Sequence, residues 1–246
     1  MASSLSLQHR HGLALGLLSL SLSPALAWAD STLLETVTVT GEQIDSYHAT
    51  SASVGGFGEA PLLDTPASVA VFTEQLLKDR QARLLSEVLS NDASTGESYA
   101  PIGYYENFVV RGFSLSAANS YKINGSTITG EQNVALENKQ QVELLKGLAG
   151  LQSGVSEPGG LVNYVTKRPQ NVRSVTVASN ESGERYIATD LGGWIDSEQR
   201  LGVRANFAHE DIRSYVDNSD GKRDFASLAV DWNITDAVSY THLTLP

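Results

Sequence analysis

Hydrophobic and polar positions alternate along four segments in the last third of the chain. VRSVTVAS and RYIATDLGGWI come first. RLGVRANFAHED follows, with apolar residues at 201, 203, 205 and 207, and DFASLAVDWNI has them at 226, 228, 230 and 232. A period of two predicts β-strands. Strands of this length with one apolar face are typical of a transmembrane β-barrel. A soluble antiparallel sheet carries the same alternation, so the pattern alone leaves both open.

The segment before these strands, roughly residues 60–169, mixes shorter elements. ASVAVFT, NFVVRGF, VELLKG and GLVNYVTKRP predict strands, and Gly112 should end the second of them. YKING predicts a strand that ends in an Asn-Gly turn. Residues 73–91 predict a helix with Thr73 as its N-cap. Its leucines and valine recur at helical spacing at 76, 77, 84, 85, 88 and 89.

The first 59 residues carry no folded-domain pattern. Arg10 precedes the uncharged run GLALGLLSLSLSPALA, and AWA at 27–29 resembles a cleavage site, so we expect a signal peptide that is cleaved before Asp30. A transmembrane anchor is the alternative, but the run is short for a span. Residues 30–59 are polar and rich in small residues, which predicts a flexible leader. Within this leader, ETVTVT alternates like a strand but has no partner strand nearby.

Charge and chemistry exclude several classes of protein. The net charge is -11, which argues against binding to nucleic acid. There is no cysteine, so neither disulfides nor thiolate metal sites are expected. GVSEP lacks the second glycine of a nucleophile elbow, GLAGLQSG lacks the Lys-Ser/Thr of a P-loop, and the five histidines lack metal-ligand spacing. We therefore expect no enzyme, no metal ligands and no cofactor.

Five stretches then occur in a specific order: LLDTPASVAVFTEQLLKD, FVVRGF, INGSTITG, VELLKGLAGLQSGVSEPGG and LVNYVTKRP. Together they closely resemble the plug domain of TonB-dependent outer-membrane receptors, in the ferric-siderophore branch. The resemblance runs from Leu33 to about Asp236. It implies an α+β plug domain, a small mixed sheet with short helices, followed by the first antiparallel strands of a transmembrane β-barrel.

The resemblance also implies a division of the chain. We expect a signal peptide at 1–29, a leader with the TonB box at 30–59, the plug at 60–169 and the first barrel strands at 170–237. Relatives close a barrel of about 22 strands, so about four strands would make this chain the N-terminal part of a longer protein. Residues 238–246 resemble translated sequencing adaptor, and we expect them to be a non-native tail.

The same resemblance assigns roles to particular residues. The TonB box would be Glu35, Thr36, Val37, Thr38, Val39 and Thr40, which the protein TonB would add to the edge of its own sheet. Ligand contacts would come from Arg111 and from a second, exposed apex formed by Thr129, Gly130 and Glu131. Lys146 replaces the arginine of the family's RGP motif. It would serve as a lock between plug and barrel that lacks the bidentate fork of arginine.

Two of these assignments carry qualifications. A structural ion pair inside the plug is the alternative role for Arg111, because a charge at the end of an apolar strand needs a partner or water. Ser153 stands where an aromatic residue is frequent in the family.

The function that the resemblance implies is TonB-dependent import of a ferric siderophore across the outer membrane of a Gram-negative bacterium. The expected partners are the siderophore, TonB with ExbB and ExbD at the inner membrane, and outer-membrane lipid. A receptor for haem, cobalamin or a glycan is the close alternative. A soluble secreted β-rich adhesin or hydrolase is the alternative from another class.

Overall fold

The structure, a computed structural model, describes residues 47–54, 61–99, 105–147, 157–214, 216–235 and 238–244. The chain divides into two units, Met1–Gln43 and Ile44–Pro246, and all the described residues belong to the second. The predicted signal peptide and the predicted TonB box at 35–40 lie outside the described residues. Among the described residues, no helix has both the length and the apolar character needed to cross a membrane.

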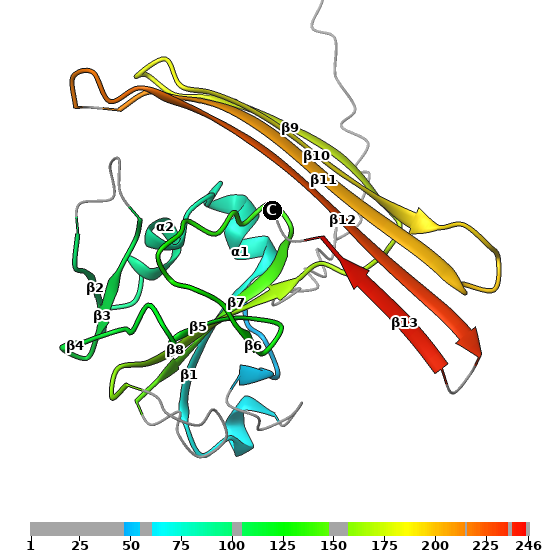
Figure 1. The fold of residues 1–246 in the computed structure, drawn as a ribbon, viewed down its shortest axis with the longest axis horizontal. Helices are drawn as coiled ribbons and strands as arrows, with labels where there is room; N and C mark the ends of the chain where they lie inside the picture. Colours follow the sequence, from blue (N-terminus) through cyan, green and yellow to red (C-terminus); the bar gives the residue numbers. More distant parts are fainter. Residues whose placement is uncertain are drawn as a thin grey trace, which may run out of the picture. The chain divides into compact units, whose positions relative to one another are not determined.

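A five-stranded sheet forms the centre of the predicted plug (Figure 1). Its strands, in spatial order, are β1 (Ser68–Thr73), β7 (Lys139–Lys146), β8 (Gly160–Thr166), β5 (Tyr121–Ile123) and β6 (Ser126–Thr127). β5 and β8 are parallel and the other pairs are antiparallel. The small mixed sheet is therefore confirmed. The predicted Asn-Gly turn joins β5 to β6, with Asn124 and Gly125 both at positive φ, 48° and 81°.

The predicted helix over 73–91 is interrupted. The structure has two short helices there, α1 (Glu74–Asp79) and α2 (Leu85–Leu89), with a 3₁₀ turn, η2 (Leu62–Asp64), before β1. Thr73 caps α1 as expected, because its hydroxyl accepts a bond from the backbone N–H of Leu76 at 3.4 Å. The chain then leaves the helix at Gln81, whose φ is 52°. The Glu87 carboxylate accepts the backbone N–H groups of Arg83 and Leu84, at 2.6 and 3.2 Å, and so starts the second helix.

A three-stranded sheet follows α2 in the chain. Its strands are β2 (Thr95–Glu97), β3 (Phe108–Val110) and β4 (Phe113–Ser114). Arg111 and Gly112, both at positive φ, make the turn between β3 and β4, so the strand ends before Gly112 as predicted. The core of the plug is formed by buried apolar side chains from the helices and both of its sheets, including Leu85, Leu89, Phe108, Leu144 and Tyr164.

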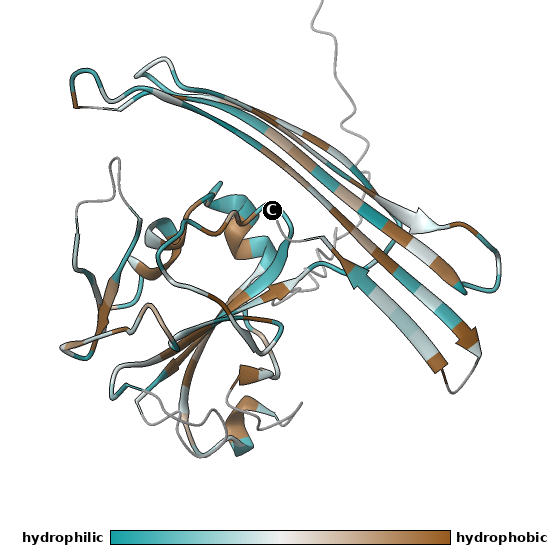
Figure 2. Ribbon diagram, viewed as in Figure 1, coloured by the Kyte–Doolittle hydropathy of each residue, from teal (hydrophilic) through white to brown (hydrophobic). Residues whose placement is uncertain are grey.

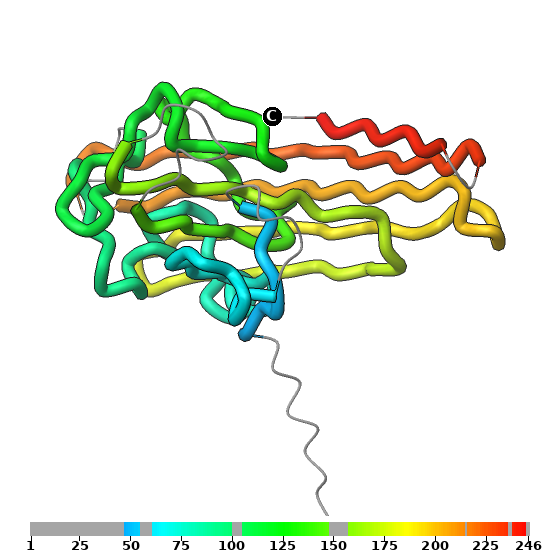
Figure 3. The backbone as a smooth tube through the Cα atoms, turned by 90° about the horizontal axis from the view of Figure 1, so that it is seen from below, coloured from blue at the N-terminus to red at the C-terminus, as the bar shows by residue number. Residues whose placement is uncertain are grey.

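A second five-stranded sheet follows the plug, and all its neighbouring pairs are antiparallel. Its strands run side by side in chain order (Figures 1 and 3): β9 (Val172–Ser179), β10 (Arg185–Trp194), β11 (Leu201–Ile212), β12 (Gly221–Thr235) and β13 (Val238–Leu243). β13 begins where the sequence predicts a non-native tail. It pairs with β12, with Tyr240 opposite Trp232.

The exposure of the two faces of the β9–β13 sheet distinguishes a transmembrane barrel from a soluble antiparallel sheet. On β11, Arg204, Asn206 and Glu210 are buried, whereas Phe207 is 51% exposed. On β12, Leu228 and Trp232 are 41% and 50% exposed. Figure 2 shows this alternation along the strands. A soluble sheet buries its apolar face, but here the covered face holds the polar residues, beside Ala208, Phe225 and Ala229, and the face with the large apolar side chains is exposed. That arrangement is the one that a lipid-facing barrel strand requires.

Candidate functional site

One cluster of charges joins the plug to the middle of the β9–β13 sheet. Arg204, 2% exposed, donates from Nε and Nη2 to the two carboxylate oxygens of Asp190 at 2.8 and 2.7 Å. Two plug residues complete the cluster. Lys167 Nζ lies 2.8 Å from Asp190 Oδ2, and Glu74 Oε1 lies 3.2 Å from Arg204 Nη2 and 3.4 Å from Lys167 Nζ. The bidentate geometry fixes Arg204 in one orientation, and charge-assisted bonds of this kind are the strong ones.

The strands make room for this cluster. Gly192 on β10 is the register partner of Arg204 on β11. A Cβ atom at Gly192 would lie 3.2 Å from Arg204 Cγ and 2.6 Å from the carbonyl oxygen of Gln170. On the plug side, burial raises the pKa of Glu74, but its bond with Lys78 and the charges of Lys167 and Arg204 outweigh burial and hold the pKa below its usual value. Glu74 is therefore ionised at neutral pH and contributes a full charge.

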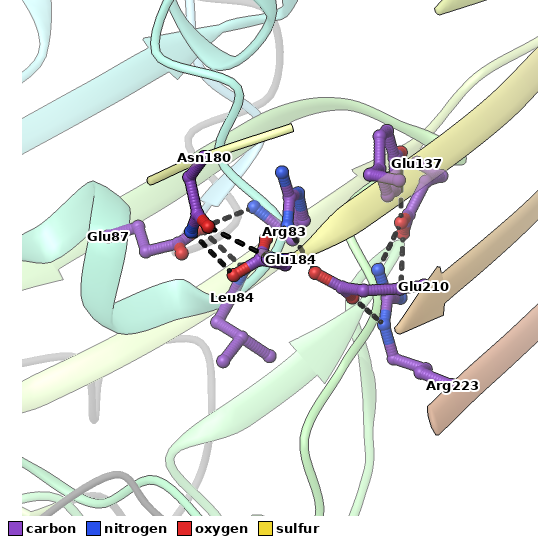
Figure 4. A network of polar contacts seen from close by, with 9 residues as sticks. Arg83, Leu84, Glu87, Glu137, Asn180, Glu184, Glu210 and Arg223 are labelled. Carbon is purple, nitrogen blue, oxygen red and sulfur yellow. Dashed lines mark hydrogen bonds and ion pairs between the residues drawn. The ribbon is translucent and has the colours of Figure 1, made fainter. Parts of the chain in front are cut away.

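A second cluster lies farther along the strands and is drawn in Figure 4. Arg83 of the plug contacts Glu184 and Glu210 of the sheet, and its guanidinium lies 4.3 Å from the centre of the Tyr186 ring. Arg223 on β12 lies between two carboxylates (Figure 4). It donates to Glu210 at 2.7 Å, and to Glu137 of the plug at 2.5 and 3.2 Å. Charges thus alternate across the boundary between plug and sheet.

A cavity of about 850 Å³ adjoins this second cluster. Both the plug and the sheet line it, with seven charged side chains: Arg83, Glu87, Glu131, Glu184, Glu210, Asp220 and Arg223. Its volume is within the range of small-molecule sites. Charges of both signs favour a polar ligand with several donors and acceptors over a purely apolar one.

Arg111, predicted to contact ligand, is exposed in the β3–β4 turn. Its backbone N–H donates to the Ser94 carbonyl at 2.7 Å, which fixes the turn. Its guanidinium lies beside Gly147, with Nη1 3.5 Å from the position of a Cβ added there. Within the described residues no carboxylate pairs with this guanidinium, so the alternative of a structural ion pair finds no partner in that part of the plug. The ligand role stays a prediction.

The second predicted apex is exposed only in part. Thr129 and Glu131 are exposed, and Glu131 lines the 850 Å³ cavity. Gly130 is buried, so the expectation that it is exposed is wrong. A Cβ there would lie 2.3 Å from the Tyr121 ring, and the Gly130 N–H donates to the Ala117 carbonyl at 2.7 Å. Gly130 is needed because the backbone passes directly against a ring, and it shapes the apex from beneath.

Lys146, predicted to lock the plug to the barrel, pairs with Asp92 of the plug itself. Burial raises the pKa of Asp92, but its bonds with Lys146 and Ser94 outweigh burial and lower it. The ion pairs that cross to the β9–β13 sheet in the described part of the chain come from other plug residues, namely Glu74, Arg83, Glu137, Lys167 and Arg168. These five residues were not predicted from the sequence. The sequence does carry one sign of these pairs. Arg204 and Glu210 are charged residues within a strand, at positions that alternate with its apolar residues.

Buried Lys139 differs from these cations because no carboxylate pairs with it within the described residues. It is 1% exposed at the start of β7, and its Nζ bonds to the neutral Oδ1 of Asn138. Burial lowers the pKa of Lys139 to about 8, although Glu137 raises it and Lys167 lowers it further. A cation in this position destabilises the boundary that the other pairs stabilise.

Comparison with known proteins identifies this architecture. Residues 61–161 match the family model of the TonB-dependent receptor plug domain. The chain belongs to the TonB-dependent receptors. Receptors of this family are outer-membrane transport proteins of Gram-negative bacteria and not enzymes, so this chain is an outer-membrane protein. The predicted plug and the antiparallel barrel strands that follow it are thereby confirmed.

Among the relatives of this receptor are two curated proteins. The metal-pseudopaline receptor CntO of Pseudomonas aeruginosa is 30% identical over 226 residues, covering 86% of this chain and 31% of the relative. The probable TonB-dependent receptor BfrD of Bordetella pertussis is 35% identical over 185 residues, covering 73% of this chain and 24% of the relative. The chain thus spans about a quarter to a third of the length of these relatives.

A solved structure shows the same fold in a receptor with a known ligand class. The crystal structure of BauA, the ferric preacinetobactin receptor of Acinetobacter baumannii, superimposes with a TM-score of 0.69 at 30% sequence identity. The superposition covers 76% of this chain and 29% of BauA. The plug and the adjoining strands therefore superimpose together on one part of a complete receptor.

Proposed function

We propose that the full-length receptor imports a ferric siderophore across the outer membrane by TonB-dependent active transport. The observation that carries this proposal is the similarity of most of the chain to receptors whose names specify metal chelates: metal-pseudopaline for CntO and ferric preacinetobactin for BauA. A plug that matches the family model over 61–161 supplies the transport element. A chelate brings its own metal ligands, so the protein needs only donors, acceptors and shape to bind it.

The ligand-binding role belongs, in this proposal, to Arg111 in the β3–β4 turn and to Thr129 and Glu131 in the loop after β6, which Gly130 shapes. All three are exposed, and Glu131 reaches the 850 Å³ cavity beside the Arg83 cluster. Arg111 supports the proposal because its guanidinium is exposed and has no carboxylate partner in the described part of the plug. An exposed cation of this kind can bind the negative charge of a ferric chelate.

The coupling role belongs to the predicted TonB box, Glu35 to Thr40. TonB would pair with this segment by strand addition and, with ExbB and ExbD at the inner membrane, would supply the energy for transport. The exposed apolar face of β9–β13, with Val175, Phe207 and Leu228 among its residues, would contact outer-membrane lipid.

Growth and uptake assays test the cargo. Cells whose only iron-chelate receptor is the full-length protein should accumulate radioactive iron from a ferric siderophore and should not grow on haem as sole iron source. Haem, cobalamin, a glycan and a non-ferric metal chelate are the competing cargoes, and each can be offered in the same strain. Uptake of one of these without uptake of any ferric siderophore would contradict the proposal.

A further inference from the structure

The segment that leads from the predicted TonB box into the plug is packed against it before β1 begins. Residues 47–54 belong to the stretch that the sequence assigned to a flexible leader. Ala52 and Val54 are 7% and 3% exposed and form a hydrophobic cluster with Leu145 and Leu161. The Thr50 carbonyl accepts the backbone N–H of Leu62 at 2.9 Å. This segment, which we call the docked segment (47–54), is thus part of the folded plug.

A buried carboxylate holds the docked segment. Glu143 lies on β7 and is 0% exposed. It accepts the backbone N–H of Ser53 at 2.8 Å and the Ser53 hydroxyl at 3.1 and 3.2 Å. Gln141 and Asn163 donate to the same carboxylate at 2.7 and 2.9 Å. Within the described residues no cation pairs with Glu143, so neutral donors alone stabilise it. Every donor that is lost leaves a buried charge less well satisfied.

The network continues across the sheet toward its β5–β6 edge. Asn163 on β8 is the register partner of Glu143 on β7. Its side-chain oxygen accepts the backbone N–H of Gly125 at 2.9 Å, in the Asn-Gly turn between β5 and β6. A row of side chains therefore connects the docked segment through β7 and β8 to that turn.

We propose that Glu143 is a positioning residue that fastens the docked segment to β7, and that its bonds to Ser53 must break before a pull on the TonB box can open the plug. The proposal rests on the proposed coupling role of the box. The chain is linear, and Ser53 lies 13 residues after Thr40 (53 − 40). Tyr47 meets Asp79 earlier, but that contact is exposed. Ser53 is hydrogen-bonded to β7, an interior strand of the sheet, so a pull transmitted along the chain to the docked segment loads this bond.

Three variants of the full-length receptor test the fastening. Ser53→Ala removes the hydroxyl that donates to Glu143. Glu143→Gln replaces one carboxylate oxygen with an NH₂ group, which would face the donors of Ser53, Gln141 or Asn163. Ser51→Ala is the matched control, because Ser51 lies in the same segment and is fixed by a backbone bridge to Pro61. Hydrogen–deuterium exchange of the detergent-purified receptor should show at least tenfold faster exchange in residues 51–54 for the first two variants. β8 should be unchanged, and Ser51→Ala should match the wild type.

The second measurement is the force of the first rupture when the purified receptor is pulled through an N-terminal tether. If Glu143 only supported the sheet, Ser53→Ala would not change this force. Ser53→Ala should lower the force of the first rupture, while affinity for a ferric chelate stays unchanged. An unchanged rupture force with unchanged exchange would overturn the proposal. So would exchange that rises as much in β8 as in the docked segment, because Glu143 would then only support the sheet. If Glu143→Gln fails to fold, Ser53→Ala decides alone. Neither readout requires transport, so a wild type without uptake would refute the proposed function and leave this result standing.

Discussion

Arg204→Met removes the charge at the centre of the first cluster while keeping a linear side chain of similar length. Arg204 is 2% exposed, and two of its nitrogens bond to Asp190 at 2.8 and 2.7 Å. Its Nη2 also lies 3.2 Å from Glu74 of the plug. The substitution therefore cuts one link between barrel and plug and leaves a buried aspartate with Lys167 as its remaining cation.

The cost follows from burial. Removing one partner of a buried ion pair costs about 3–5 kcal/mol. Because Lys167 stays 2.8 Å from Asp190, we expect the low end of this range, about 3 kcal/mol. The exposed pair of Arg200 and Glu198 provides the contrast, with side chains that are 63% and 64% exposed. Exposed pairs contribute about 0–1 kcal/mol, so Arg200→Met is the matched control.

Hydrogen–deuterium exchange of the full-length receptor measures this difference within the folded barrel. A loss of about 3 kcal/mol corresponds to about a hundredfold faster exchange for plug amides that open when the plug leaves the barrel wall. We expect this in α1 and the first turn after it, next to Glu74, for Arg204→Met and not for Arg200→Met. Equal exchange in the two variants would contradict this prediction, because the buried cluster would then contribute no more than a surface pair.

Three further predictions concern single side chains. Lys139→Met should stabilise the plug at neutral pH by about 3 kcal/mol, the equivalent of a pKa lowered from 10.5 to about 8. Between those values the unfolded chain binds more protons, so wild-type stability in urea melts should rise from pH 8 to 10.5; a variant with the same rise would contradict this. Arg111→Ala should weaken chelate binding to whole cells without loss of protein, whereas unchanged affinity would favour a structural role. Lys146→Ala should destabilise the plug at pH values above the usual pKa of Asp92, and the loss of stability should shrink as acid protonates Asp92. A loss of stability that persists in acid would point to lost packing instead.

The strands of the fold could be predicted because apolar and polar residues alternate with a period of two whether the apolar face contacts lipid or a protein core. Which face is covered could not, since Arg204 and Phe207 alternate equally well in a soluble sheet and in a barrel. The break between α1 and α2 was also hidden. Residues 73–91 keep helical spacing, but Gln81 adopts positive φ and Glu87 caps a new helix start.

The candidate site was predictable only where the sequence carries a local signal. The end of the strand before Gly112 followed from RGF. The burial of Gly130 depends on the ring of Tyr121, which reaches it through the fold of the loop. Glu143 lies inside the apolar stretch VELLKG, and its partner Ser53 is 90 residues away. Contacts at such separation leave no periodic trace in one sequence, so the pairs that fasten plug, leader and barrel emerge only from the structure.

Energised uptake by a Val37→Pro variant of the full-length receptor tests TonB-dependent import through the predicted TonB box. Val37 lies in the middle of the predicted TonB box, and proline there removes a backbone donor and disfavours a central strand position. Whole cells carrying Val37→Pro should bind the ferric siderophore with wild-type affinity but accumulate none of it when the inner membrane is energised. Wild-type uptake by this variant, or loss of binding together with uptake, would contradict TonB-dependent import through this segment.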